Sequence, residues 1–581
     1  MRTPLISALL LSLSPTFVAP LHAQRPTDAE IRTRAAEYLS RLERLGYSGG
    51  ALVVRGGTTV FMQSVGMADR AAAIRADANT VYSLGSITKQ FTAAAILRLE
   101  EQGKLRTTDS LARFFPHAPI DKRAITLHHL LTHTAGFRSD YSPSDYEATT
   151  RDEYVKRMFD APLRTKPGAA HFYANAGYSL LAAIVEIVTQ QDYEDALSTL
   201  VLTPAGMLAT GYKRPAWPAQ RIAHGTQNGK DWGTILERIN TPGAPYWELR
   251  GNGGLHTTLG DIAKWDAALS SSRVFTDSSR RKFMTGYVNE GPAGLSKYAY
   301  GWAVSHTSRG TTLVQHNGGN GVYVAELLRF VDDSVTVFMT STNSEMTATP
   351  AVWVLSRIAL GQSYTLPPAR VAVAATVQTS VAGRYVLSDG SQLNVTAANG
   401  KLFAEAIGQQ AFQLVATGDT ASSAKSAEYN TQSRAIVERL VRGDIGLLRH
   451  ALGPGADDSA TVAQQEAQLL AYRKETFGEF KSIDVLGTAP SPEGALRTTV
   501  RVNYARGGAT NLYTWDRDGT IMDIGARPYQ PVQLAAALDG DLHTVDERAG
   551  SGARFRDVNG ALAAITPRGA ILLKRAAKPL Q

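Results

Sequence analysis

The spacing of apolar residues predicts a helix, a hairpin and then a long helical region. Apolar positions recur at helical spacing over 31–45, directly after the capping-box sequence Thr27–Glu30. Two short apolar runs at 51–54 and 59–62 predict a β-hairpin. From residue 86 to about 266, helical patterns dominate.

Short strand patterns return after residue 300. They lie at 301–304, 312–314, 322–330 and 335–339, and a helix over about 351–360 follows them. This order predicts an α+β fold, in which the two halves of one sheet flank a large helical insertion.

The last third of the chain has a different pattern. The stretch 363–378 is rich in proline and alanine and is expected to be a linker. A β-rich module over 379–425 and an α+β module over 426–581 are predicted to follow. The predicted elements are hairpins at Asp389-Gly390 and Asn399-Gly400, helices at 434–442 and 462–473, and strands at 481–486, 496–504, 511–515 and 571–574.

The first 23 residues have the order of a secretory signal. Met1-Arg2 is followed by an apolar run over 5–21, and cleavage is expected after Ala23. The chain contains no cysteine, so it can form no disulfide. We therefore expect an exported, periplasmic or secreted protein without a transmembrane anchor, whose catalytic domain covers 24–362.

The composition is that of a globular protein with an excess of basic residues. The formal net charge is +8 and the hydrophobic fraction is 44%. No run of Lys and Arg interleaved with aromatic residues occurs, so nucleic acid is not an expected partner.

Ser86 and Lys89 form the first chemical motif, at the predicted start of a helix. Residues at i and i+3 share a helix face, so a lysine amine can act as base toward the serine hydroxyl. Free backbone N–H groups at a helix start can also stabilise an oxyanion. The same Ser-x-x-Lys spacing recurs at Ser279/Lys282 and Ser422/Lys425, which we interpret as a charged turn and a polar linker. Ser48 fits a G-x-S-x-G pattern, but it lacks the preceding strand and following helix of a nucleophile elbow.

Two further motifs follow along the chain. Tyr173-Ala174-Asn175 precedes an apolar helix; the tyrosine can relay the serine proton, and the Asn175 amide can contact a substrate carbonyl or Lys89. A rival Tyr287-Val288-Asn289 lies in a polar stretch. A predicted strand runs into His316-Asn317-Gly318-Gly319, where the Gly319 N–H can be a second oxyanion donor beside that of Ser86.

The order of these motifs resembles that of the penicillin-recognising serine hydrolases: class C β-lactamases, DD-peptidases, and related esterases and D-aminopeptidases. Further matching stretches are 130–136, 204–207 and 253–258, and the resemblance covers about residues 30–360. It implies a β-lactamase/transpeptidase-like fold, Ser86 as nucleophile, Lys89 as base assisted by Tyr173, and a site lined by Asn175 and His316-x-Gly318. The C-terminal modules resemble the small β-barrels of D-aminopeptidase-like relatives.

His316 departs from the lactamases, which have lysine there. A histidine is mostly neutral at pH 7, whereas a lysine is a fixed cation suited to a substrate carboxylate. This difference favours an esterase or a D-aminopeptidase-like enzyme over a β-lactamase or DD-carboxypeptidase acting on cell-wall peptides. A non-turnover acyl-enzyme trap or cell-wall sensor is the alternative from another class. His129 and His133 have zinc-pair spacing without the accompanying glutamate, so no metal or other cofactor is expected.

Overall fold

The structure is a computed structural model. It describes residues 25–576, apart from 139–140, 142–143, 228, 240–245, 291–293, 295, 345, 368, 399, 454–466, 468–469, 471–472, 475–476, 491–494, 517, 529–530 and 546–551. The predicted signal segment 1–23 and most of the predicted helix 462–473 lie outside the described residues.

An antiparallel eight-stranded sheet organises the first 360 residues. Its order is β2-β1-β14-β13-β12-β11-β10-β9. The strands are β1 (Gly49–Arg55), β2 (Thr58–Val65), β9 (Val288–Asn289), β10 (Ser296–Tyr298), β11 (Ala303–His306), β12 (Thr312–Gly319), β13 (Val324–Phe330) and β14 (Val335–Ser341). Because β1 pairs with β14, the two predicted halves form one sheet, and the predicted α+β class is confirmed.

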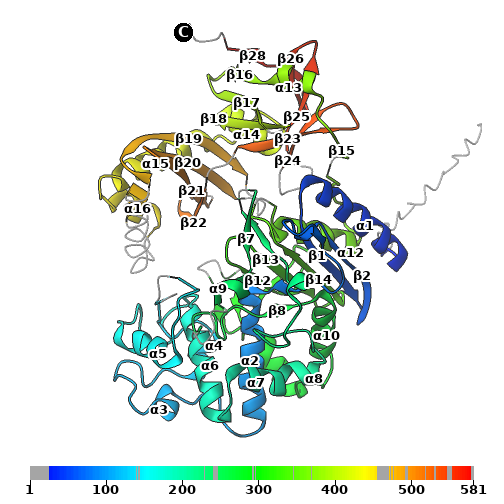
Figure 1. Cartoon of the computed structure of the whole chain (residues 1–581). Coiled ribbons are helices and arrows are strands. Elements are labelled where there is room, and N and C mark those ends of the chain that lie inside the picture. The colour runs from blue at the N-terminus through cyan, green and yellow to red at the C-terminus, as the bar shows by residue number, and fades with distance from the viewer. Residues whose placement is uncertain are drawn as a thin grey trace, which may run out of the picture.

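Two helices, α1 (Asp28–Leu45) and α12 (Ala348–Leu360), pack together against one face of this sheet (Figure 1). The predicted capping box begins α1: the Thr27 side chain accepts from the Glu30 amide, and the Glu30 carboxylate accepts from the Thr27 amide. Helix α12 begins after Thr347, slightly before its predicted start.

The helical region packs on the opposite face around α2 (Thr88–Glu101), and it carries the candidate site. Eleven of the α2 side chains are buried, on every side of the helix, as expected for a helix at the centre of a core. The other helices are α3 (Leu111–Phe114), α4 (Leu127–Leu131), α5 (Arg151–Asp160), α6 (Asn175–Thr189), α7 (Tyr193–Leu197), α8 (Thr203–Ala205), α9 (Ile235–Ile239), α10 (Leu259–Leu269) and α11 (Asp277–Met284). Short strands between them are β3 (Met67–Asp69), β4 (Ile74–Arg75), β5 (Tyr82–Ser83), β6 (Gly225–Gln227), β7 (Lys230–Gly233) and β8 (His256–Thr257). Within the described part of the chain, none of the helices has both the length and the apolar character needed to cross a bilayer.

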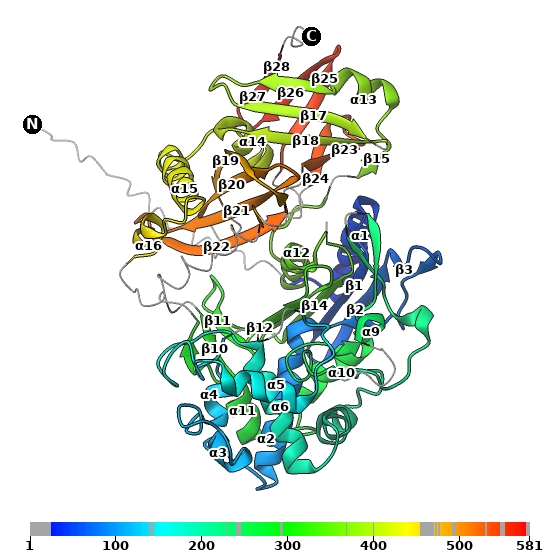
Figure 2. The ribbon, with the colours of Figure 1, turned by 60° about the vertical axis from the view of Figure 1, so that its left-hand side comes forward.

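A second, curved sheet is built from two separate parts of the C-terminal region (Figure 2). Strand β18 pairs with β23, and β28 at the end of the chain pairs back with β16. The strands are β15 (Arg370–Val371), β16 (Gly383–Val386), β17 (Gln392–Ala398), β18 (Lys401–Ile407), β23 (Val532–Ala537), β24 (Leu542–Val545), β25 (Arg554–Val558), β26 (Ala561–Thr566), β27 (Gly569–Leu572) and β28 (Lys574–Arg575).

The segment between β18 and β23 forms a four-stranded sheet of its own. Its strands are β19 (Phe480–Pro490), β20 (Leu496–Tyr504), β21 (Gly507–Trp515) and β22 (Ile521–Pro528). Helices α15 (Ser426–Leu440) and α16 (Gly446–Ala451) share a core with it, and α14 (Gln409–Thr417) contacts β18 and β19.

The sheets group the C-terminal residues differently from the sequence prediction. The strands of 426–581 are divided between the two sheets, because β23–β28 complete the sheet begun by β16–β18. The predicted linker 363–378 contains β15, which pairs with β23, and the start of α13 (Ala375–Val381). The predicted boundary at residue 425 therefore does not follow the sheets.

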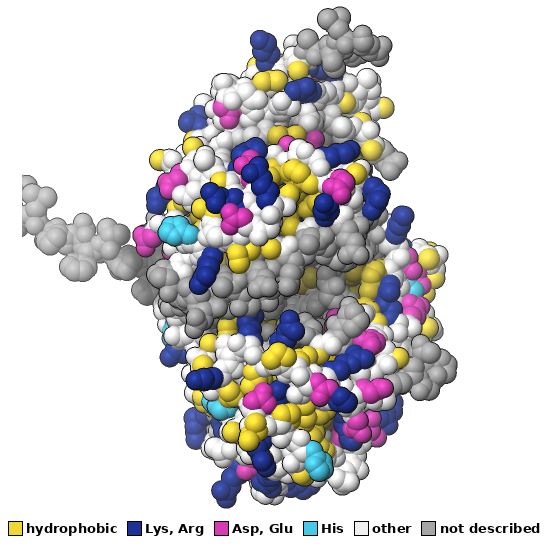
Figure 3. Space-filling view, turned by 90° about the vertical axis from the view of Figure 1, so that its left-hand side faces the viewer, with side chains coloured by type: hydrophobic (Ala, Val, Ile, Leu, Met, Phe, Trp, Pro, Cys, Tyr) yellow, Lys and Arg dark blue, Asp and Glu magenta, His cyan; other side chains and the backbone are white. Residues whose placement is uncertain are grey.

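Charged side chains are spread over the face seen in Figure 3, where Lys and Arg are interspersed with Asp and Glu. The chain has a net charge of +8, but its basic side chains do not gather into a single patch on this face.

Candidate active site

Ser86 lies in the tight connection between β5 and α2. The sequence predicts this serine at the start of a helix, and the structure places it in a single 3-10 turn, Gly85–Ile87, directly before α2. The turn requires a glycine, since Gly85 has φ +51° and a Cβ there would lie 2.4 Å from the Gly319 nitrogen. The turn thus holds Ser86 beside the end of β12.

Lys89 has three oxygen partners around its amine. Nζ lies 3.0 Å from Ser86 Oγ, 2.8 Å from Asn175 Oδ1 and 2.7 Å from the Asn252 carbonyl oxygen. The amide and carbonyl oxygens can only accept, so they occupy two N–H groups of the amine, while the third position faces the serine hydroxyl. A neutral amine can accept the serine proton there, and the resulting ammonium keeps all three partners.

Tyr173 and Asn175 approach Lys89 from the start of α6. Asn175 is the first residue of that helix. The Tyr173 ring centroid lies 4.7 Å from Lys89 Nζ, and the side chain is 38% exposed. Tyr173 is therefore more exposed than Asn175 and Lys89, and its ring centroid lies 6.2 Å from that of His316.

His316 is buried on β12, on the face of the sheet that carries α2. Nδ1 lies 2.6 Å from the Asn317 carbonyl oxygen and Nε2 lies 3.0 Å from the Tyr298 hydroxyl. A carbonyl only accepts, so Nδ1 carries the hydrogen, and Nε2 accepts from Tyr298. Burial, and then the charge of Lys89, lower the pKa of His316 to about 4. The imidazole is therefore neutral at pH 7, with both nitrogens occupied.

The backbone at Gly318 and Gly319 packs against the serine turn. A Cβ on Gly318 would lie 2.0 Å from the Leu84 oxygen and 2.7 Å from the Ser86 nitrogen. Only glycine permits this approach, which places the backbone of Gly318 and Gly319 directly against the turn that carries the Ser86 amide. The structure thus brings together all seven predicted residues: Ser86, Lys89, Tyr173, Asn175, His316, Gly318 and Gly319.

Three residues contact the predicted site residues although no sequence pattern placed them there. Asn252 contacts Lys89 through its backbone carbonyl, which leaves no side-chain signal for that contact, and Tyr298 lies outside every motif. His133, with φ +56°, stacks 4.3 Å from the Tyr173 ring centroid, and its Nδ1 accepts from the Ala174 amide at 3.1 Å. Burial, and then Lys89, lower the pKa of His133 well below its usual value. The sequence signal for His133 was its position within 130–136, one of the stretches that match the penicillin-recognising serine hydrolases.

The rejected motifs have structural partners elsewhere. Ser48 bonds both the N–H and the carbonyl of Met67. Lys282 pairs with Glu100, and Tyr287 stacks on Tyr300. His129 Nδ1 accepts from the Thr126 amide, within the cap of α4. These contacts account for each side chain without chemistry.

The fold and the site together define a penicillin-recognising serine hydrolase. The Beta-lactamase family model matches residues 32–359, more than half of the chain, so the chain belongs to the Beta-lactamase family.

Curated relatives agree with this assignment. The chain is 26% identical to "Penicillin-binding protein 4*" of Bacillus subtilis, over 65% of this chain and 88% of the relative. It is 31% identical to "Putative penicillin-binding protein PbpX" of the same organism, over 48% and 68%. It is 24% identical to "D-alanyl-D-alanine-carboxypeptidase/endopeptidase AmpH" of Escherichia coli, over 60% and 92%.

One solved structure resembles nearly the whole fold. It is that of the octameric penicillin-binding protein homologue from Pyrococcus abyssi, with a TM-score of 0.54 and 18% identity over 93% of this chain and 99% of the other. At this identity the likeness concerns the fold alone.

Proposed function

We propose that the protein is an exported serine hydrolase that cleaves an ester or amide bond through an acyl-enzyme on Ser86. The observation that carries the proposal is the contact of Lys89 Nζ with Ser86 Oγ, Asn175 Oδ1 and the Asn252 carbonyl. Lys89 takes the serine proton as Ser86 attacks the substrate carbonyl. The Ser86 and Gly319 amides stabilise the oxyanion, and Lys89 with Tyr173 returns the proton to the leaving group. Water then releases the acyl group.

The preferred substrates in this proposal carry no free carboxylate beside the scissile bond. His316 is neutral, and it offers no free N–H because its one hydrogen points to the Asn317 carbonyl. A substrate carboxylate beside His316 would find neither a positive charge nor a free N–H on that side chain. This supports an esterase or a D-aminopeptidase-like enzyme.

The second candidate is a carboxypeptidase acting on cell-wall peptides, with β-lactamase activity as its variant. It is favoured by the similarity to AmpH, whose name describes a D-alanyl-D-alanine-carboxypeptidase/endopeptidase and most of whose length is covered. Its carboxylate contact would have to come from residues other than His316.

The experiment compares p-nitrophenyl butyrate, D-alanyl-p-nitroanilide, a D-alanyl-D-alanine peptide and a chromogenic cephalosporin on one enzyme preparation. Steady turnover of the ester or anilide supports the first candidate, and preference for the dipeptide or cephalosporin supports the second. A single stoichiometric burst on every substrate would instead identify an acyl-enzyme trap.

A matched pair of variants tests the nucleophile. Ser86→Ala is expected to abolish turnover with the fold intact, while Ser279→Ala, at the chain's other structured Ser-x-x-Lys, is expected to keep it. A folded, active Ser86→Ala protein would overturn the mechanism.

A further inference from the structure

The Asn252 carbonyl belongs to a buried irregular segment, Trp247–Leu255. This segment precedes β8 and contains neither helix nor strand, yet every residue in it is buried. Gly251 has φ +77°, and a Cβ there would lie 2.5 Å from the Tyr178 oxygen. Turn-type backbone bonds join the Arg250 amide to the Trp247 carbonyl at 2.9 Å and the Gly253 amide to the Leu249 carbonyl at 3.2 Å, and the Asn252 side chain donates to Ser179 Oγ and the Glu248 carbonyl. Because no helix or sheet ladder runs through the segment, side-chain contacts add to these bonds in holding the Asn252 carbonyl in place.

Helix α2 holds one side of the segment. The Thr92 hydroxyl donates to the Gly251 carbonyl at 2.6 Å, and the Leu255 amide donates to the Thr88 hydroxyl at 3.2 Å. Lys89 contacts the Asn252 carbonyl between these two bonds. The helix that carries the predicted base is thus bonded to the segment three times.

Arg250 holds the other side, where it is 8% exposed. Its Nη1 and Nη2 donate to the two carboxylate oxygens of Asp192, at 3.2 and 3.3 Å. The guanidinium carbon lies 4.5 Å from the Tyr246 ring centroid and 5.3 Å from that of Tyr212. Asp192 is itself fixed as the N-cap of α7, where it accepts from the Glu194 amide. The buried member of the pair is Arg250, because the Asp192 side chain is 42% exposed, so removing Asp192 leaves a buried guanidinium without its carboxylate partner.

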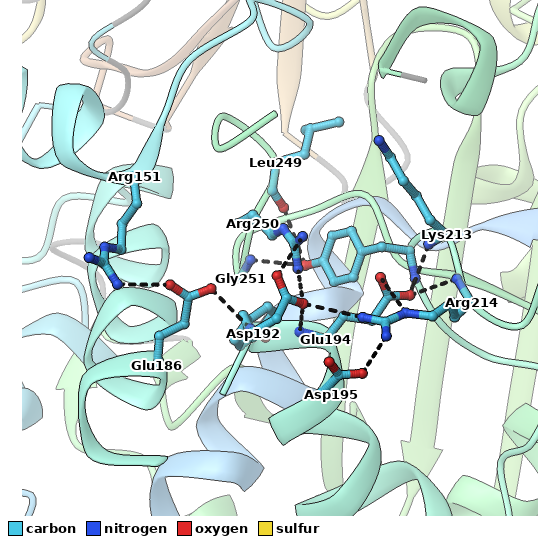
Figure 4. A network of polar contacts seen from close by, with 12 residues as sticks. Arg151, Glu186, Asp192, Glu194, Asp195, Lys213, Arg214, Leu249, Arg250 and Gly251 are labelled. Carbon is cyan, nitrogen blue, oxygen red and sulfur yellow. Dashed lines mark hydrogen bonds and ion pairs between the residues drawn. The ribbon is translucent and has the colours of Figure 1, made fainter. Parts of the chain in front are cut away.

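A second anchor runs through Tyr212, and Figure 4 labels its partners Glu194, Leu249 and Gly251. Glu194 accepts three consecutive amides, of Tyr212, Lys213 and Arg214, at 2.7, 2.8 and 2.8 Å. The Tyr212 hydroxyl then accepts from the Gly251 amide at 2.9 Å and donates to the Leu249 carbonyl at 3.3 Å. Both anchors end on the residues that directly precede Asn252.

We propose that Arg250, paired with Asp192, is a positioning residue for the catalytic lysine. The pair fixes Leu249–Asn252 so that the Asn252 carbonyl accepts from Lys89 and holds the amine toward Ser86. This inference rests on the proposed function, in which Lys89 is the base, and in it Arg250 and Asp192 act only through the Asn252 carbonyl.

The test compares two Arg–Asp pairs in which the arginine is largely buried; the Asp192 side chain is 42% exposed and that of Asp266 is 7% exposed. Arg250→Gln and Asp192→Asn disturb the proposed device, and the asparagine keeps the cap acceptor of α7. Arg329→Gln is the matched control, because Arg329 donates to Asp266 at 2.9 Å from β13, opposite Val314 and away from the serine turn. The substrate is p-nitrophenyl butyrate, with kcat, KM, thermal midpoint and amide hydrogen exchange of 247–255 as readouts.

Arg250→Gln is expected to lower kcat about 10-fold or more, as a misplaced catalytic group does, with KM within about 2-fold. Exchange over 247–255 should rise, and Asp192→Asn should give a smaller effect of the same kind. Arg329→Gln should lower the thermal midpoint and leave kcat and this exchange unchanged. The inference would be overturned if Arg250→Gln and Arg329→Gln had equal thermal midpoints and Arg250→Gln lost no more kcat than Arg329→Gln.

The pH profile gives a readout that a structural role would not move. A carbonyl that accepts from Lys89 favours the ammonium, so its displacement should move the acidic limb of kcat to lower pH. An unmoved limb in both variants overturns the inference. If the wild type turns over no substrate of the panel, the proposed function fails. Amide hydrogen exchange over 247–255 still tests whether Arg250 holds this segment. Unchanged exchange in Arg250→Gln would overturn the inference.

Discussion

The buried Tyr298 hydroxyl of β10 donates to Nε2 of His316 on β12 at 3.0 Å. This bond, together with the Asn317 carbonyl on Nδ1, fixes one neutral tautomer of the imidazole. A residue outside every motif therefore fixes the hydrogen-bonding pattern of His316, the residue at which the sequence departs from the lysine expected by resemblance to the lactamases.

Tyr298→Phe removes this donor and leaves a buried ring nitrogen without its partner. We expect a loss of about 1–3 kcal/mol in the free energy of unfolding, and an altered ratio of kcat/KM between the butyrate ester and the dipeptide. Urea unfolding and the substrate panel measure the two effects. Tyr300→Phe is the control, since the Tyr300 hydroxyl contacts His128 Nδ1 at 2.8 Å outside the site. It should change stability but not the substrate ratio, and equal ratios in both variants would contradict the assignment.

Asn175→Asp replaces an amide oxygen beside Lys89 with a carboxylate of the same shape. The new charge favours the ammonium, which cannot accept the serine proton. Turnover of p-nitrophenyl butyrate is expected to fall about 100-fold, within the range of general base catalysis, with the acidic limb of the pH profile moved to higher pH. An unchanged profile would show that Lys89 is not the base.

Gly318→Ala places a Cβ against the Leu84 carbonyl and the Ser86 amide. The oxyanion donors must then move apart, and kcat is expected to fall at least about 10-fold. Gly260→Ala in α10 is the control, because its nearest neighbour would lie 3.9 Å away. This change should stabilise the helix by about 0.5–1 kcal/mol without affecting kcat. Steady-state kinetics and thermal unfolding distinguish the two variants.

Buried His256 makes stability depend on pH. Burial lowers the pKa of His256 to about 4 in the folded protein, against about 6.5 in the unfolded chain. The unfolded state therefore binds the extra proton first as the pH falls, and stability is lost between about pH 6.5 and 4. From pH 7 to pH 5 this loss is about 2 kcal/mol for one such group.

His256→Gln should flatten the fall in stability by that amount, and urea unfolding at several pH values measures it. His450→Gln, at an exposed histidine, is the control and should leave the slope as in the wild type. A slope in His256→Gln equal to that of the wild type would contradict the prediction.

Side-chain motifs made the site predictable, because serine, lysine, tyrosine and histidine carry their chemistry in the sequence. Asn252 was missed because its contact with Lys89 uses a backbone carbonyl, whose position depends on the neighbouring Arg250 and on Asp192, which is far from it along the chain. The regular apolar spacing of α1 and of β1–β2 was sufficient to predict these elements. Strands β23 and β26 were missed because they are rich in alanine, a residue with a weak preference for strands; Ala535 and Ala563 are examples.

The pairing of β18 with β23 also sets an order of assembly. Strands β16–β18 leave the ribosome long before β23, and the four-stranded unit between them is contiguous, so it can fold first. Until β23 arrives, β18 presents an open edge that can recruit other chains. A chain that stops after β22 never covers the edge of β18. Nonsense mutations near the C-terminus should therefore cause aggregation, even though Ser86, Lys89 and the eight-stranded sheet are already complete.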